Sequence, residues 1–483
     1  MAKLDKWENI IKEKRKTTAF RDFVKEITSW TVLNLYKHKW KICRYPDSWR
    51  VKNLDSKESQ NASNYFLDYD FNKWFFENFK DLFEKTPLQY MLDFWNNENS
   101  DFADVAFWVK NAYLTFVVWL WVENVAYSAF CYLNSSNIFN SFLVSYNCNN
   151  IYFSAWITNS FNIFYSKYVN DSSNIWFSTN LIWCQECIFC NWLQNQKYCF
   201  QNKVLEKEDY EKIKKSILEK KDTFLENYKF ISKNEPLNYL SENVNWKYNI
   251  KCHNVENWYW ITNTDNSRNV INTWWDGSCD FYDSFDAWLN SKYLYWANWV
   301  WNNSNNIYCS TQIDVCSDIY YSYFLKNCSF CLWCVWLKNK SFCILNKEYS
   351  KEEWYELVDK IFTQMDSNWI LWEFFPWELN PFYFNDTMAY LIDDTFTKEE
   401  VEKQWYMWRN EEIKVDIAEW MDVVNVKDLD IVNFDESILK KVIVDKNWNY
   451  YKIVKMEYDF LKKHNLPLPE IHWLDRIKLW FKF

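Results

Sequence analysis

Glycine is almost absent from this chain, which has one glycine (Gly277) and 34 tryptophans among its 483 residues. Folded proteins use about 7% glycine, and this is the share that tryptophan has here (34 of 483). Glycine takes up left-handed turn conformations at no steric cost, whereas tryptophan does not. The run DKNWN at 445–449 lies between two β-rich runs, and glycine at 448 would make it an Asn-Gly hairpin turn; the run WWDG at 274–277 has the same form.

We therefore interpret most tryptophans as standing at glycine positions, as they would if UGA codons that specify glycine were read as tryptophan. The alternative is a protein that is truly rich in tryptophan. Under the first interpretation, a tryptophan in this sequence is no indication of an aromatic binding site.

Catalytic motifs are also missing. Four histidines (His38, His253, His464, His472) are scattered, and none belongs to a metalloprotease or nucleophile motif. Glycine at every tryptophan position would still create no phosphate-binding loop. Acidic pairs such as Asp393-Asp394 are adjacent, which favours a solvated loop over an acid–base pair. An enzyme is therefore not the favoured interpretation.

Charge and hydropathy exclude further classes. A net charge of −10 argues against a nucleic-acid-binding protein. The most apolar run, 112–122, is too short to span a bilayer, and the first twenty residues lack the apolar core of a secretory signal. The expected location is the cytoplasm, where the fifteen cysteines would be reduced thiols.

A repeat of 12 to 13 residues begins near residue 101. Its Asn-apolar-apolar signature recurs at Asn111, Asn124, Asn137, Asn150, Asn162 and Asn174, and resumes at Asn257, Asn269, Asp280, Lys292, Asn306, Asp318 and Cys331. Short β-branched and aromatic runs between Asn and Ser predict strands that must stack to bury their apolar faces. We predict a mainly β fold, a β-solenoid in which the recurring Asn amides form ladders. The sequence leaves open whether one coil holds one unit or two.

The repeat region is duplicated at an offset of 144 residues, since 173–203 aligns with 317–347 without a gap. A charged amphipathic helix follows each copy: one begins at 205, and the other opens with a capping box at Ser350 and Glu353 and runs to about Met365. The offset pairs Tyr210 with Trp354. We predict two tandem solenoid arrays, each closed by a helix that covers its open end.

The rest of the chain surrounds these arrays. A stripe of Phe75, Phe76, Phe79, Leu82 and Phe83 predicts a helix that packs on the first repeat coil. A hairpin at 441–454 followed by a helix near 456–464 predicts a small C-terminal unit. The predicted segments are a helical N-terminal region (1–100), the first array (101–204), a helical cap and linker (205–240), the second array (241–347), a helical cap and irregular strap (348–410) and a small α+β unit (411–483).

Each array ends in a cysteine cluster, formed by Cys184, Cys187, Cys190 and Cys199 in the first copy and by Cys328, Cys331, Cys334 and Cys343 in the second. Thiolates at this spacing can bind zinc or an iron–sulfur centre. The clusters are also in phase with the repeat, so the thiols would point inward and stack as small apolar groups. Packing without a cofactor is the favoured interpretation, and a zinc or iron–sulfur site is the alternative.

The stretch CSFCLWCVWLKNKSFCILNKEYSKEEWYELV at 328–358, with WEFFPWELNPFYFNDTMA, FNKWFFENFKDLFEKTP and HNLPLPEIH, resembles an uncharacterised family of cysteine-rich repeat proteins from ultrasmall candidate-phylum bacteria. The resemblance covers most of 70–483 and implies a degenerate zinc ribbon in the C-terminal unit. Paired ribbon cysteines are absent, because the first hundred residues hold only Cys43 and 344–483 hold none. The resemblance implies no activity.

The favoured function is a non-enzymatic repeat scaffold that offers a side of its stacked coils to a protein partner. A zinc or iron–sulfur module and a polysaccharide-processing solenoid, which would need two carboxylates in a groove, are the alternatives.

Overall fold

The computed structural model describes residues 2–15, 20–38, 41–46, 54–55, 62–92, 96–231, 249–250, 261–262, 272–274, 286–288, 291–371, 373–375, 377–410, 417, 419 and 421–481. The predicted repeat positions Asn257, Asn269 and Asp280, the turn at Gly277 and His253 lie outside these residues. The chain divides into two compact units, one of residues 1–91 with 238–410 and the other of 92–237 with 411–483. The six-segment division stays a prediction.

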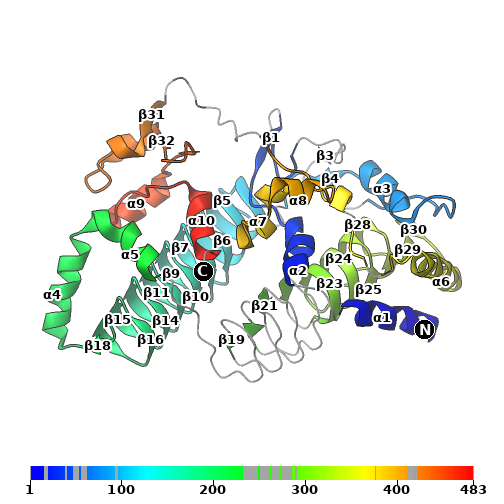
Figure 1. Cartoon of the computed structure of the whole chain (residues 1–483), viewed down its shortest axis with the longest axis horizontal. Helices are drawn as coiled ribbons and strands as arrows, with labels where there is room; N and C mark the ends of the chain where they lie inside the picture. Colours follow the sequence, from blue (N-terminus) through cyan, green and yellow to red (C-terminus); the bar gives the residue numbers. More distant parts are fainter. Residues whose placement is uncertain are drawn as a thin grey trace. The chain divides into compact units, whose positions relative to one another are not determined.

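The fold is mainly β, as predicted, with β-solenoid coils between residues 116 and 344, about 14 turns in all, and helices at the ends. Figure 1 shows the coils as rows of short parallel strands. One sheet has 14 strands (β5 to β18) and another has 12 (β19 to β30). We call residues 102–204 and 291–348 the first and second solenoid segments.

In the first segment, paired residues are 13 apart in the earlier coils and 12 apart from Asn149 onward. Its strands are β5 (Phe102–Ala126), β6 (Ala129–Tyr132), β7 (Ser136–Phe139), β8 (Phe142–Ser145), β9 (Asn149–Tyr152), β10 (Ala155–Thr158), β11 (Phe161–Phe164), β12 (Lys167–Asn170), β13 (Ser173–Trp176), β14 (Thr179–Ile182), β15 (Gln185–Ile188), β16 (Asn191–Gln194), β17 (Lys197–Phe200) and β18 (Lys203–Val204). The second sheet comprises β19 (Asn249–Ile250), β20 (Ile261–Thr262), β21 (Asn272–Trp274), β22 (Asp286–Trp288), β23 (Lys292–Trp301), β24 (Asn305–Asp314), β25 (Ser317–Tyr320), β26 (Tyr323–Lys326), β27 (Ser329–Leu332), β28 (Val335–Lys338), β29 (Ser341–Ile344) and β30 (Lys347–Glu348).

One coil is one repeat unit, which answers the question that the sequence left open. Ile163 pairs with Ile151 in the coil before and with Ile175 in the coil after, so equivalent residues are 12 apart. The predicted positions Lys292 and Cys331 are out of phase by one residue. Lys292 pairs with Asn305, and Cys331 pairs with Ile319, so neither stands in the column of Asn306 and Asp318.

Every third residue from Asn150 to Gln201 has a positive φ, which gives four left-handed residues in each 12-residue coil. Asn and Asp tolerate this conformation, whereas it strains aromatic residues because their Cβ lies too close to the following carbonyl oxygen. Two of the four columns are mainly aromatic, and stacking holds one of them together: Phe153, Tyr165, Phe177 and Phe189 follow one another at centroid distances of 5.1, 5.4 and 5.2 Å. The others carry amides. The predicted Asn ladder is confirmed, since Asn150, Asn162 and Asn174 are joined by Nδ2-to-Oδ1 hydrogen bonds of 2.9 and 2.8 Å.

The residue after each left-handed one points into the coil. In the first segment these inward residues alternate between aliphatic and hydroxyl side chains, as in Ile151, Ser154, Ile157 and Ser160. The serines form their own columns. Ser166 Oγ donates to Phe164 O (2.8 Å) and accepts from the backbone N–H of Ser178 (3.1 Å), twelve residues on. The buried serines therefore connect each coil to the next through its backbone.

The helices after the coils lie close to the predicted places. In the first copy the chain forms two helices, α4 (Lys207–Leu218) and α5 (Phe224–Ile231), because it turns at 221–223. The turn brings the ring of Phe224 against that of Phe177, with 5.1 Å between the centroids. In the second copy α6 (Lys351–Ser367) has the predicted capping box at Ser350 and Glu353. Trp354 in α6 is buried and donates its indole N–H to Cys343 O at 3.2 Å.

The unit that holds the second segment includes the N-terminal helices α1 (Ala2–Arg15), α2 (Phe20–Ile27) and α3 (Phe75–Lys85), the short strands β1 (Tyr36–His38), β2 (Lys41–Cys43), β3 (Leu54–Asp55) and β4 (Leu88–Gln89), and the later helices α7 (Met388–Ile392) and α8 (Lys398–Glu402). The predicted stripe of α3 is buried, but it does not pack on the first repeat coil. It lies on the last coils of the second segment, where Phe75 meets Tyr321 at 5.7 Å and Phe83 meets Tyr323 at 5.4 Å. The aromatic rings there offer the edge-to-face partners that phenylalanine prefers.

The C-terminal residues of the other unit form β31 (Asp422–Asn425), β32 (Lys441–Val444), β33 (Tyr450–Tyr451), α9 (Lys455–Lys463) and α10 (Trp473–Phe481). The predicted hairpin and first helix are present, and α10 was not predicted. These residues dock on the first segment through a buried polar cluster. Glu457 and Arg476 are both 0% exposed and 3.5 Å apart, and Asn140 Nδ2 donates to Glu457 at 2.7 Å.

Breaking this cluster should release the C-terminal residues. Arg476→Ala leaves the Glu457 carboxylate buried without its cation, which costs about 3 kcal/mol. We expect a lower urea midpoint and faster proteolysis after residue 410, whereas Lys478→Ala, at a lysine on the same helix whose side chain is 33% exposed, should change neither. Equal stability of the two variants would show that the cluster does not hold this part of the chain.

Three exposed tryptophans stand at left-handed turn positions. Trp369 and Trp405 follow helices α6 and α8, Trp448 lies in the predicted hairpin turn, and their φ angles are 62°, 65° and 63°. All three are about 70% exposed. At Trp369 the N–H of Ile370 donates to Met365 O, the bond of a helix end that usually carries glycine.

We expect Trp448→Gly to stabilise the protein by about 1 kcal/mol, because the left-handed conformation costs an L-residue about that much and glycine nothing. Urea unfolding measures the change. Trp448→Ala is the control, since it removes the ring but keeps the Cβ and should gain little. An equal gain from alanine would assign the effect to the exposed ring.

Candidate functional site

The eight cluster cysteines face the inside of the coils. Cys187 and Cys199 continue the aliphatic column of Ile163 and Ile175, and they pair directly with each other in register. Cys184 and Cys190 instead occupy serine columns, and their backbone N–H groups donate to Ser172 Oγ and Ser178 Oγ at 2.9 Å each. The second cluster repeats this arrangement, with Cys331 and Cys343 in the aliphatic column and Cys328 and Cys334 in place of serine.

Packing of this kind is what the phase of the clusters predicted. All eight thiols are buried, and in the first cluster the thiols donate to the carbonyl two residues before, as Cys190 Sγ does to Ile188 O at 3.3 Å. A hydrogen bond between the Cys187 and Cys184 thiols lowers the pKa of Cys184 to about 7 and raises the pKa of Cys187. Burial raises the pKa of Cys331 and of Cys334.

Among the described residues, no three or more His, Cys, Asp or Glu side chains form a group that could hold a metal ion. The zinc role of Cys184, Cys187, Cys190, Cys199, Cys328, Cys331, Cys334 and Cys343 stays a prediction. Likewise, no helix in the described ranges is long and apolar enough to cross a membrane.

Two histidines are held neutral. Burial lowers the pKa of His464 to about 4 and that of His472 to about 3. His464 packs against Phe164 and Phe460, at centroid distances of 5.4 and 4.4 Å, where α9 meets the first segment. The His464 side chain therefore belongs to the docking of the C-terminal residues, whereas His472 packs among those residues against Tyr451 and Trp473. Both are poor proton donors near neutral pH.

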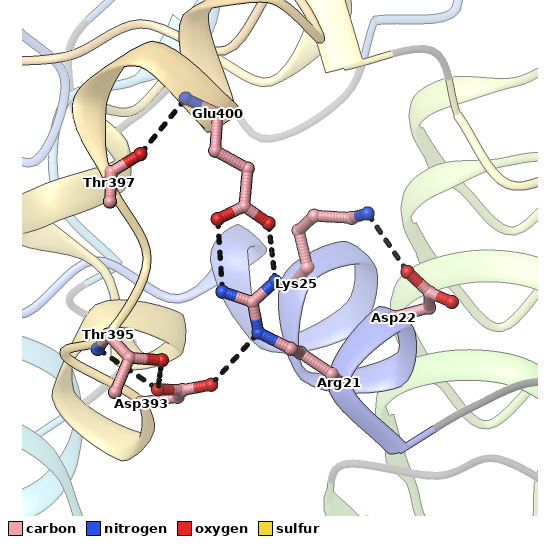
Figure 2. A network of polar contacts seen from close by, with 7 residues as sticks. All are labelled: Arg21, Asp22, Lys25, Asp393, Thr395, Thr397 and Glu400. Atoms are coloured by element: carbon pink, nitrogen blue, oxygen red, sulfur yellow. Dashed lines mark hydrogen bonds and ion pairs between the residues drawn. The ribbon is translucent and has the colours of Figure 1, made fainter.

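Two carboxylates from α8 and the end of α7 converge on one cation, as Figure 2 shows. Arg21 in α2 binds both oxygens of Glu400, and its Nε donates to Asp393 at 3.4 Å. The hydrogen bond from Arg21 lowers the pKa of Glu400. A glycosidase acid needs a raised pKa and a free proton, so this pair joins helices rather than cleaving sugars. Asp393 also accepts from the Thr395 backbone N–H at 3.0 Å.

One left-handed column is exposed along both segments, and we call it the amide face. Its members are Asn159, Asp171, Trp183 and Asn195 in the first segment and Asn303, Val315, Asn327 and Asn339 in the second. The two sets are related by the 144-residue offset. Amide hydrogen bonds hold neighbouring coils in line, from Asn159 to Asp171 at 2.6 Å and from Asn327 to Asn339 at 2.7 Å.

Other columns of the first segment are covered by the chain itself. Phe139 and Tyr152 lie under Phe460 of α9, and Tyr165 and Phe177 lie under Phe224 of α5. In each segment the amide face therefore offers polar groups at the spacing between strands, about 4.8 Å, interrupted by Trp183 in the first and by Val315 in the second.

Comparison with known proteins gives no relative. The chain matches no protein-family model, no curated protein and no solved structure.

Sequence reasoning missed the inward three-residue period. The signal is present, since Ser154, Ser160, Ser166, Ser172 and Ser178 stand six residues apart with an aliphatic residue midway between successive serines. Extended into the cysteine cluster, the same six-residue spacing assigns Cys184 and Cys190 to the serine columns and Cys187 and Cys199 to the aliphatic column.

This division predicts unequal effects of serine at two neighbouring cysteines. Cys190→Ser should be nearly neutral, because Ser166 and Ser178 already occupy that column. Cys187→Ser places a hydroxyl in the aliphatic column and should cost about 1 to 2 kcal/mol. Urea unfolding under reducing conditions compares them. A larger loss for Cys190→Ser would overturn the assignment of columns.

Proposed function

We propose that this protein is a non-enzymatic scaffold built from two tandem solenoid arrays, each closed by an amphipathic helix, and that it binds a protein partner along the amide face. The arrays span 101–204 and 241–347, and α4 and α6 are their helical caps. The 144-residue offset supports the duplication, because it relates the cysteine columns, the terminal hairpins and the buried residues Tyr210 and Trp354.

The observation that carries the proposal is the contrast between covered and exposed columns. Stacked aromatic columns attract the chain's own helices, whereas the amide face stays exposed in every described coil from Asn159 to Asn195 and from Asn303 to Asn339. Hydrogen bonds between coils join Asn159 to Asp171 and Asn327 to Asn339, so a partner would meet amides that have already lost rotamer freedom. A partner rich in backbone or side-chain hydrogen-bonding groups fits such a face.

Site-specific photo-cross-linking in the native host tests the proposal. A photoreactive residue at Asp171 or at Asn327 should cross-link the same protein, and Asn159→Arg or Asn339→Arg in the respective array should abolish the product. A photoreactive residue at Lys212, which is 74% exposed on α4, is the matched control and should give no such product.

A native mass spectrum separates this function from the metal-binding one. Retention of a protein partner without a metal adduct supports the scaffold. One or two metal ions, held natively and lost on unfolding, together with no product from either cross-linking position, would instead make the cysteine clusters the functional site.

We also propose that most tryptophans are glycine in the protein as its source makes it, which the resemblance to the candidate-phylum family supports. The left-handed positions of Trp369, Trp405 and Trp448 favour glycine, and α9 ends in the same way on Asn465, whose φ is 56°. Peptide masses of protein purified from the source should carry glycine at these three positions. Tryptophan at all three would overturn the proposal.

A further inference from the structure

The two solenoid segments end in the same way. Asn202 accepts from the N–H of Asn191 at 2.8 Å and donates to its carbonyl at 2.9 Å, and Asn346 does the same to Val335 at the same distances. These residues are 144 apart. Each asparagine thus completes the pairing of the last strand of its column, β16 in the first segment and β28 in the second.

The end of the second segment is covered by residues 62–69, which we call the covering segment. Ala62 donates its backbone N–H to Trp336 O at 2.7 Å and accepts at its carbonyl from Asn346 Nδ2 at 3.4 Å. Five residues on, the N–H of Leu67 donates to Leu345 O at 3.1 Å. The covering segment therefore crosses the end of the coil through backbone hydrogen bonds.

Side chains add to these bonds. Asp68 forms an ion pair with Lys347, and the ring of Tyr69 lies against Trp333 at 5.4 Å. Ala62 is 2% exposed, so only a small residue fits there. As a result Trp336 and Leu337 are each 1% exposed.

The end of the first segment has the same groups, but they are exposed. The offset maps Trp336, Asn346 and Lys347 to Trp192, Asn202 and Lys203, all of them exposed, with Trp192 at 49%. Leu193, the counterpart of Leu337, is only half-buried, and β16 stands at the edge of its sheet. Phe189 replaces Trp333 as the aromatic group. The acceptor at 192 is a backbone carbonyl, so it is present with either tryptophan or glycine.

We propose that the end of the first segment binds an extended segment of a partner protein with the chemistry of the covering segment: a small residue, then leucine five residues on, followed by aspartate and an aromatic residue. This inference rests on the proposed function. It adds a second site of contact with the partner protein and specifies that the partner binds there as an extended segment. Backbone groups would add to the edge at β16, and the aspartate would pair with Lys203. A second copy of the chain is not the occupant, because each copy's covering segment is bound to its own second end.

A labelled peptide of residues 62–71 is the probe, titrated into the full-length protein and followed by fluorescence anisotropy. One equivalent should bind. Lys203→Glu should weaken binding about three-fold, as expected for a solvent-exposed ion pair, and a peptide with Asp68→Lys should recover affinity for that variant. Lys212→Glu makes the same charge change on α4 and should have no effect.

Two outcomes would overturn the inference. One is saturable binding that Lys347→Glu alters and Lys203→Glu does not, which would mean that the peptide displaces the covering segment. The other is no binding while both Lys203→Glu and the parent remain folded. Cross-links from Asp171 and Asn327 would still stand in either case, so failure here is distinct from failure of the amide face.

Discussion

The buried serine column is the constraint on which the coils depend. A 12-residue coil with a left-handed residue at every third position turns its backbone too often for strand pairing to satisfy every amide. Ser154, Ser166 and Ser178 solve this, because each hydroxyl accepts an N–H from the next coil and donates to a carbonyl of its own. A buried N–H left without a partner would cost about 1 to 3 kcal/mol in each coil.

The same constraint explains the cysteines. A thiol is a weaker acceptor than a hydroxyl but is small enough for the column, and at the end of a segment fewer coils remain to be joined. Cys184 and Cys190 stand where the serine columns finish, and their thiols donate to carbonyls as the serines do. Cys328 goes further, since its N–H donates to the sulfur of Cys316 at 3.3 Å. The Cys-x-x-Cys-x-x-Cys spacing, which suggests metal ligands, thus arises because the serine and aliphatic columns alternate every three residues along the chain.

Much of this fold could be predicted from the sequence, because the repeat leaves an external signature. The Asn step predicted the repeat unit and the ladder, but not whether one coil holds one unit or two, and the capping box at Ser350 predicted the start of α6. The place of α3 could not be predicted, since Phe75 and Phe83 are compatible with any aromatic surface and only tertiary packing selects Tyr321 and Tyr323. The docking of α9 and α10 could not be predicted either. In the sequence Glu457 and Arg476 resemble surface charges, and only the folded chain places them beside Asn140. For the site, the inward direction of the thiols followed from phase, whereas the exposure of the amide face depends on which columns the helices cover.

The two segments share a core and differ in their coverings, and this difference locates the sequence-specific part of the protein. Core columns tolerate exchange of Ile with Val, Leu or Cys, so they fix the spacing of the coils and little else. The coverings are specific: Phe224 selects the Tyr165 column, Phe460 selects the Phe139 and Tyr152 column, and Ala62 fits only an end that offers Trp336 O and Asn346. The end of the first segment keeps the backbone acceptor, the amide and the lysine of this contact. In the described part of the chain, nothing like the covering segment lies on them. Leu193 packs against the core of the first segment but stays half-buried there, and a covering segment would complete its burial.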